Sequence, residues 1–255
     1  MKSLLIAVSM YSKLPVPRVD WDKKSLAWAL CWLPLVGAVM GALLYGWLRL
    51  AALLALGPMV RGAAALLLPI ALSGAIHLDG FCDTCDALGS HQDRARKLEI
   101  LKDSHTGAFA VICCGLYLIL FFAAWCEVLS VGRTALVLAL GPVLSRSLSG
   151  LAAVSWRNAR GAGLLASFTA PMAAGRARLI FLLWTAACAA GMLLLDPWTG
   201  AAALVGAGLS FGYYAGVSHR QFGGITGDLA GFFLQICECA MVLSVVLAQK
   251  IGVLL

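Results

Sequence analysis

Residues 107–129 read GAFAVICCGLYLILFFAAWCEVL, an apolar run whose one charged residue, Glu127, stands near its end. A helix needs about 20 apolar residues to cross the roughly 30 Å hydrocarbon core of a bilayer. Similar runs lie on both sides of this one, at 27–48, 58–76, 134–154, 178–195, 199–217 and 229–249. The sequence therefore predicts an all-α, polytopic integral membrane protein with about seven transmembrane helices.

The composition of the whole chain agrees with this class. Of its 255 residues 62% are hydrophobic and 12% are charged, and the mean hydropathy is +0.92. Soluble domains are about half apolar and about a quarter charged, so a soluble protein is excluded. The longest polar stretch, 77–106, is too short to bury a core of its own, and we expect a single domain over residues 1–255. The stretch Leu4–Met10 lacks a signal-peptide cleavage site and predicts a short interfacial helix.

The basic residues predict the orientation in the membrane. If the N-terminus is cytoplasmic, fifteen of the nineteen Lys and Arg residues, with Arg146 among them, belong to the cytoplasmic side. Four belong to the other side, namely Arg49, Arg61, Arg133 and Lys250. Cytoplasmic loops carry the excess of basic residues, so we predict a cytoplasmic N-terminus and an external C-terminus. The net charge of +7 thus indicates topology, and we expect no nucleic-acid partner.

Acidic residues gather directly after the second apolar run. Six of the twelve lie within 79–103, beside His77, His91 and His105. Asp79, Asp83 and Asp86 have the spacing i, i+4 and i+7, which puts them on one helical face, where their repulsion near lipid requires a cation. Carboxylates together with substrate phosphates are typical of Mg²⁺ sites. The alternatives are a solvated acidic helix end, or zinc at Cys82 and Cys85, for which no second pair has suitable spacing.

Polar groups also mark the start of the third apolar run. Asp103 or Ser104 would serve as its helix N-cap. The same geometry can receive a phosphate, with Lys102 as a point charge. Arg146, inside the fourth of the seven apolar runs, either binds a diphosphate or snorkels to the interface. Glu127 and Glu238 are interpreted as interfacial residues.

A glycine-rich block, Gly223-Gly224-Ile225-Thr226-Gly227-Asp228, opens the last apolar run. Gly223 and Gly224 would let backbone amides approach a phosphate, with the Thr226 hydroxyl beside them, and Asp228 could ligate a metal or act as a general base. The alternative is a tight connection before a membrane helix. We expect the block to fold back beside the aspartate helix.

Six segments of the chain carry a resemblance to a known family. The cobalamin synthase family is resembled nearly from end to end by Lys13-Leu14-Pro15-Val16-Pro17, Leu33-Pro34-Leu35-Val36-Gly37, His77-Leu78-Asp79-Gly80, Asp83-Thr84-Cys85-Asp86, Lys102-Asp103-Ser104 and the glycine-rich block. Cys82 and Ala87 depart from that pattern, because many members have alanine and glycine there. Neither departure removes a candidate ligand.

The resemblance implies transfer of the cobinamide phosphoryl group from adenosylcobinamide-GDP to alpha-ribazole or its 5′-phosphate. GMP leaves, Mg²⁺ is the cofactor, and the active site faces the cytoplasm of a bacterial-type inner membrane. The lipid bilayer is a further partner, and a homo-oligomer is possible. The expected metal ligands are Asp79, Asp83, Asp86, Asp103 and Asp228, the expected phosphate-binding residues are Lys102, Ser104, Arg146, Gly223, Gly224 and Thr226, and the expected catalytic residues are His77, Asp83 and Asp228.

Three other classes of membrane protein are alternatives to this interpretation. CDP-alcohol phosphotransferases also hold aspartates over Mg²⁺, but their Asp-Gly-x-x-Ala-Arg block is missing here. Aromatic prenyltransferases have two separated Asp-rich motifs, whereas the second site here has only Asp228. Transporters often contain internal repeats with sites near the midplane of the bilayer, and this chain has no convincing repeat.

Overall fold

The computed structural model describes every residue except 1, 18, 130–131, 162–173 and 255. The described chain is helical apart from turns and one isolated bridge between Asn158 and Ile225. Its helices are α1 (Lys2–Tyr11), α2 (Lys23–Ala29), the short η1 (Leu30–Trp32), α3 (Leu33–Leu53), α4 (Pro58–Ser73), α5 (Ile76–Gly89), α6 (Arg94–Ile100), α7 (Ala108–Glu127), α8 (Arg133–Ser155), α10 (Ala174–Leu195), α11 (Pro197–Val217), the π-helical η2 (Ser218–Phe222) and α12 (Gly227–Leu254).

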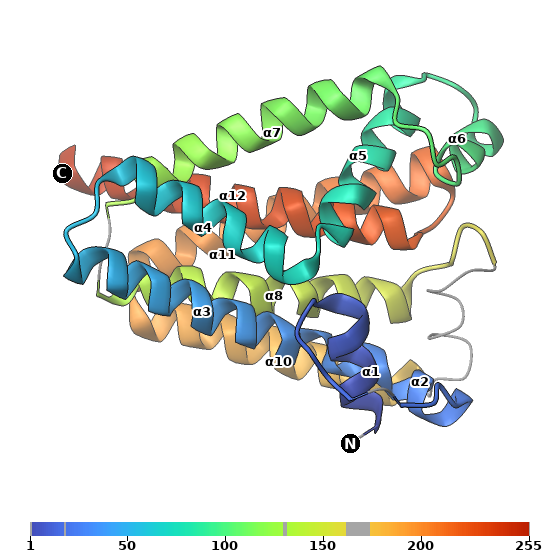
Figure 1. The fold of residues 1–255 in the computed structure, drawn as a ribbon, viewed down its shortest axis with the longest axis horizontal. Coiled ribbons are helices and arrows are strands. Elements are labelled where there is room, and N and C mark those ends of the chain that lie inside the picture. The colour runs from blue at the N-terminus through green and yellow to red at the C-terminus, as the bar shows by residue number, and fades with distance from the viewer. Residues whose placement is uncertain (1, 18, 130–131, 162–173, 255) are drawn as a thin grey trace.

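The long helices confirm the polytopic membrane class. Six segments are long and apolar enough to cross a bilayer, and the bent pair of α4 and α5 raises the number to as many as seven. Their bounds differ from the predicted runs by only a few residues at most ends. The long helices lie side by side, and the two ends of the chain lie at opposite ends of the bundle (Figure 1). The predicted N-terminal helix is also present, as α1.

The second predicted span departs from a simple membrane helix. α4 has 16 residues, which at 1.5 Å per residue is about 24 Å and shorter than the hydrocarbon core. It ends at Gly74 and Ala75, which both adopt left-handed backbone angles with φ of 61° and 63°. The chain turns by 94° there, and α5 crosses the bundle. The aspartates therefore lie on a transverse helix that is separate from the second apolar run.

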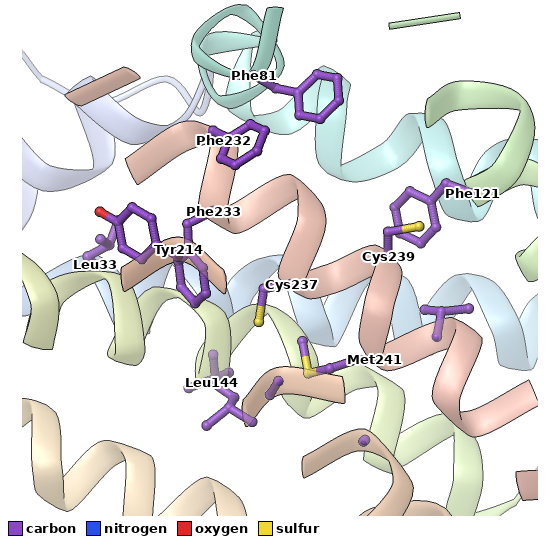
Figure 2. Close-up of a cluster of buried hydrophobic side chains, with 14 of the residues drawn as sticks. Leu33, Phe81, Phe121, Leu144, Tyr214, Phe232, Phe233, Cys237, Cys239 and Met241 are labelled. Atoms are coloured by element: carbon purple, nitrogen blue, oxygen red, sulfur yellow. The ribbon is translucent and has the colours of Figure 1, made fainter. Parts of the chain in front are cut away.

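α12 forms the centre of the bundle, where it packs against α11, α8, α5 and α7. Figure 2 shows two aromatic pairs along it. Phe81 of α5 stacks on Phe232 with ring centroids 5.6 Å apart, and Tyr214 of α11 stacks on Phe233 at 4.7 Å. The outer faces of α7 and α10 instead expose large apolar side chains such as Ile119 and Leu194, as lipid-facing helices do.

Candidate functional site

A cavity of about 220 Å³ opens at the end of the bundle where α8 and α11 finish and α12 begins. Four predicted site residues line it: His77 and Asp79 from α5, and Thr226 and Asp228 from the start of α12. The structure thus brings together two motifs that lie far apart in the sequence. Two polar residues that we did not predict, Asn158 and Arg160, line the same cavity.

Two glycines allow α5 and α12 to cross at close range. A Cβ atom on Gly80 would lie 2.8 Å from the carbonyl oxygen of Asp228 and 2.9 Å from its Cα. A Cβ on Gly231 would lie 2.9 Å from the carbonyl oxygen of His77. Both contacts are with backbone, which cannot move aside as a flexible side chain could. The glycine of the His-Leu-Asp-Gly motif therefore has a structural role, because it lets the two acidic segments meet.

Three carboxylates and one guanidinium meet at this crossing. Asp83 lies one turn beyond Asp79 on α5, and its carboxylate interacts electrostatically with those of Asp79 and Asp228. The Nη2 atom of Arg160 lies 2.9 Å from Oδ2 of Asp228. The side chains of this ion pair are 21% and 25% exposed, so both groups remain accessible from the cavity. The site thus combines negative charge on α5 with a cation that can attract an anion.

Arg160 is held by a short loop after α8. The Asn158 side-chain oxygen accepts hydrogen bonds from the backbone N–H groups of Arg160 and Gly161, at 2.9 and 3.0 Å. The same loop pairs with the glycine-rich block, since Ile225 N donates to Arg157 O and Ala159 N donates to Ile225 O, both at 2.9 Å. Asn in such a turn is a recognisable sequence signal. Its pairing with residue 225 is non-local, and no local pattern predicts it.

Gly223 and Gly224 build this connection and do not line the cavity in the described part of the chain. Gly223 has a left-handed φ of 76°, and a Cβ on Gly224 would lie 2.2 Å from Arg157 O. The Gly224 amide donates to Ser218 O at 3.0 Å, so it is already used within the backbone. The tight-connection alternative therefore describes these two glycines, while Thr226 and Asp228 of the same block reach the cavity.

His77 begins the motif on α5 and is 7% exposed. Its Nε2 atom is buried, and within the described residues it has no hydrogen-bond partner. A buried polar atom without a partner is uncommon and costs desolvation energy. Since His77 lines the cavity, a substrate group there can supply that partner.

Asp86 has a different environment from Asp79 and Asp83. Its Oδ2 accepts a hydrogen bond from the Gly107 amide at 2.6 Å, and its Oδ1 accepts one from the Ala110 amide at 2.8 Å. These amides lie at the N-terminus of α7, where backbone donors lack partners within the helix. Asp86 therefore caps α7 from a neighbouring helix, and both of its oxygens are engaged.

The predicted N-cap at Asp103 or Ser104 is wrong, because α7 begins later, with Gly107 as its N-cap. Lys102, Asp103 and Ser104 are exposed in the turn after α6 and do not belong to the described lining of the cavity. The Asp103 carboxylate accepts hydrogen bonds from the backbone amide and the ring of His105, which hold the pKa of Asp103 below its usual range.

Arg146 is neither at the interface nor among the residues that line the cavity. It is 2% exposed, and its Nη1 lies 2.6 Å from Oε1 of Glu238 on α12. The same nitrogen donates to Pro142 O, and Ser145 Oγ donates to the Glu238 carboxylate at 2.9 Å. The interpretation of Glu238 as interfacial is therefore wrong. The interpretation of Glu127 as an interfacial residue agrees with its exposed ion pair with Lys250 at the opposite end of the bundle.

The carboxylates can be compared with what a metal ion requires. In the described chain, no three His, Cys, Asp or Glu side chains stand close enough together to hold an ion. Cys82 and Cys85 hydrogen-bond to Cys114 and Cys113 of α7, so they do not add to the aspartate face. Mg²⁺ commonly uses one or two carboxylates and completes its shell with substrate phosphates and water. Asp79 lines the cavity, whereas Asp83 lies one turn beyond it on α5 and outside the lining. The two carboxylates together fit that incomplete type of site.

The fold and the site together define a polytopic membrane protein with a carboxylate and guanidinium site at one end of its helical bundle. The chain belongs to the cobalamin-5-phosphate synthase family, whose model matches residues 3–246. A relative from Lachnoclostridium phytofermentans, named adenosylcobinamide-GDP ribazoletransferase, is 40% identical over 98% of this chain and 95% of its own length. A relative of the same name from Stutzerimonas stutzeri is 36% identical over 99% of this chain and 100% of its own. No solved structure matches the chain.

Proposed function

We propose that this protein carries out the last assembly step of cobalamin, the transfer of the adenosylcobinamide phosphoryl group from adenosylcobinamide-GDP to alpha-ribazole or its 5′-phosphate, with release of GMP. The family and the names of the relatives support this reaction. The observation that carries it in this chain is the meeting of Asp79, Asp228 and Arg160 around one cavity, with Asp83 one turn beyond Asp79 on α5. Phosphoryl transfer depends mainly on positioning and on neutralising charge, which these groups can do.

Arg160 is our candidate for holding the diphosphate of the donor. Its guanidinium has donors to spare, because Nε is buried without a hydrogen-bond partner among the described residues and only Nη2 approaches Asp228. A guanidinium binds phosphate oxygens through paired, charge-assisted hydrogen bonds. The ion pair with Asp228 fixes the guanidinium on the wall of the cavity. Arg160 thus takes the role that the sequence assigned to Arg146.

Asp79 and Asp83, with Asp228 nearby, are the proposed ligands of Mg²⁺. When bound there, the ion would neutralise the diphosphate and the charge that passes to the leaving GMP. Without a cation, the three carboxylates repel one another across the crossing of α5 and α12. Asp86 is left out of this set because both of its oxygens cap α7.

His77 is the proposed general base for the acceptor hydroxyl. The unpartnered Nε2 atom can accept a hydrogen bond from that hydroxyl and then its proton. Asp228, the other candidate on the cavity wall, already has one carboxylate oxygen in the ion pair with Arg160. His77 lies beside Asp79, so the hydroxyl and the phosphate could meet on one wall of the cavity.

We also propose that the cavity opens toward the cytoplasm of a bacterial inner membrane. Removing the buried Arg146 from the fifteen basic residues of that side leaves fourteen, against four on the other. The positive-inside rule then favours a cytoplasmic position for the segments before α3, between α5 and α7, after α8 and before α12.

The test is a reconstituted reaction. Purified protein is incubated with adenosylcobinamide-GDP, alpha-ribazole and Mg²⁺, and the products are separated and identified. We expect a cobalamin product and an equal amount of GMP, both lost on adding a metal chelator and restored by Mg²⁺. Failure to form GMP with a stably folded preparation and either acceptor would contradict the proposed function.

A further inference from the structure

A second cavity, of about 390 Å³, lies beside the first and shares Ile76 and Asp79 with it. Its other walls come from the end of α1 and from the bend between α4 and α5, including Ser12, Lys13 and Gly74. Among the residues that line it, only Lys13 and Asp79 carry a charge. Asp79 therefore stands between two cavities, each of which contains one cation, Arg160 in the first and Lys13 in the second.

Lys13 is held in this place by backbone contacts. Its amide donates to Leu72 O at 2.7 Å, which satisfies a carbonyl at the C-terminal end of α4. Its aliphatic stem lies directly over Gly74, where an added Cβ would be 2.2 Å from Lys13 Cε. Gly74 has a left-handed φ of 61°, so the same residue both makes the bend and leaves room for the lysine. The lysine is thus built into the wall of the cavity.

The Lys13 ammonium has no carboxylate partner among the described residues, although Asp79 lines the same cavity. An ammonium on a concave wall is a point charge suited to a phosphate monoester. Its backbone is held by Leu72 and its stem lies against Gly74, so less conformational entropy is lost when an anion binds than for a lysine on an open surface.

We propose that the second cavity binds the acceptor nucleoside and that Lys13 recognises its 5′-phosphate. This inference rests on the proposed function, which requires two substrates to meet. With the donor diphosphate at Arg160 and the acceptor phosphate at Lys13, the reacting groups approach from the two sides of Asp79, and His77 lies on the side of the first cavity. Lys13 is a specificity-determining residue in this scheme, and it takes no part in the chemistry.

The test compares alpha-ribazole with alpha-ribazole 5′-phosphate in the wild-type protein, Lys13→Met and Lys13→Arg. Methionine keeps an unbranched stem over Gly74 and removes only the charge, so the bend is retained. Lys13→Met should raise KM for the phosphorylated acceptor about ten-fold or more, and should leave KM for alpha-ribazole and for the donor unchanged. Lys13→Arg keeps the positive charge and should therefore retain most of the preference for the phosphorylated acceptor. Lys2→Ala, which removes an exposed lysine from the start of α1, is the matched control.

A binding measurement separates this inference from the proposed reaction. Titration of alpha-ribazole 5′-phosphate into the full-length protein without Mg²⁺ should give a Kd that weakens in Lys13→Met and not in Lys2→Ala. An equal loss of both acceptors, or no loss of either, would overturn the role of Lys13. If the wild-type protein binds the acceptor through Lys13 but forms no GMP, the proposed function fails and the binding site remains.

Discussion

At the scale of single residues, Asp228 has neighbours of both signs. Arg160 lies 2.9 Å from it, while Asp79 and Asp83 face it across the crossing of two helices. The guanidinium fixes the direction of the Asp228 carboxylate, and the other carboxylates leave a net negative site that a metal ion can balance. Removing the charge of the Asp228 carboxylate should therefore disturb both the position of Arg160 and the binding of the metal ion.

Asp228→Asn is expected to lower turnover by about 100-fold or more, because the variant keeps the shape of the side chain but loses its charge. The effect should come mainly through the transition state, so kcat should fall more than KM rises if chemistry limits the rate. Steady-state kinetics of the variant measure both. Asp20→Asn, at an exposed aspartate that is not among the residues lining the cavity, is the control. A loss of the same size in both variants would show that the assay reports folding.

The buried pair of Arg146 and Glu238 gives a second prediction at this scale. Glu238→Ala leaves a guanidinium that is only 2% exposed without its partner, which typically costs about 3–5 kcal/mol. The double variant Arg146→Met with Glu238→Leu removes both charges, and we expect it to recover most of the lost stability. Thermal unfolding in detergent measures the difference.

The same double variant tests the sequence-based role of Arg146. A structural pair predicts an unchanged KM for adenosylcobinamide-GDP once both charges are removed. A rise in that KM of about ten-fold or more would mean that Arg146 binds the diphosphate after all.

The sequence predicted those site residues that carry their own local signal. His77, Asp79 and Asp228 stood out because charged and titratable groups are rare beside apolar runs. Arg160 did not, since many arginines follow membrane helices and only its pairing with Asp228 distinguishes it. Asp86 continues the helical spacing of Asp79 and Asp83, but its carboxylate points to the first amides of α7. The spacing of the aspartates does not indicate where α7 begins, so this contact could not be predicted.

At the scale of the helices, the site depends on the bend that makes α5 a transverse helix. Apolar periodicity predicted the run at 58–76 but not the 94° turn, because that turn comes from the left-handed angles at Gly74 and Ala75. Alanine gives no sequence signal for such an angle. The turn carries the aspartates across α12, and the small residues at the crossing decide how closely the two helices approach.

Gly80→Ala tests that crossing. The added methyl would lie 2.8 Å from the Asp228 carbonyl oxygen, so α5 and α12 must move apart. We expect a destabilisation of about 1–3 kcal/mol, together with a fall in turnover that exceeds the loss of folded protein. Thermal unfolding and kcat are measured on the same preparation.

Gly115→Ala on α7 is the matched control, because a Cβ there would meet nothing within 4 Å. Glycine to alanine in an open helical position should be neutral or slightly stabilising. Unchanged activity in Gly80→Ala would mean that the close approach of α5 and α12 is not needed for the site.

At the scale of the whole molecule, the distribution of basic residues and the position of the cavity indicate the same orientation in the membrane. The cavity and most of the loops that carry basic residues belong to the same end of the bundle, and the other end holds Arg49, Arg61, Arg133 and Lys250. Composition predicted the membrane class, and the positions of the apolar runs predicted the approximate bounds of the long helices, because burial in lipid leaves few alternatives to a continuous apolar helix. The order of helices within the bundle was not predicted, since it depends on contacts between distant segments.

Epitope insertion tests this polarity, with one tag after Gln92 and another after Ala55. Both positions are exposed and lie between helices, the first between α5 and α6 and the second between α3 and α4. The sequence-based topology assigns fourteen basic residues to the side of Gln92 and four to the side of Ala55, so we expect the first tag to be cytoplasmic and the second external. Antibody labelling of spheroplasts before and after permeabilisation distinguishes an external tag from a cytoplasmic one.

Turnover of each tagged protein confirms that the fold is intact. Two tags on one side would refute the crossing of the membrane by the bent pair of α4 and α5, which lies between them. An inverted pair would place the cavity outside, where a nucleotide-activated donor from the cytoplasm could not reach Arg160.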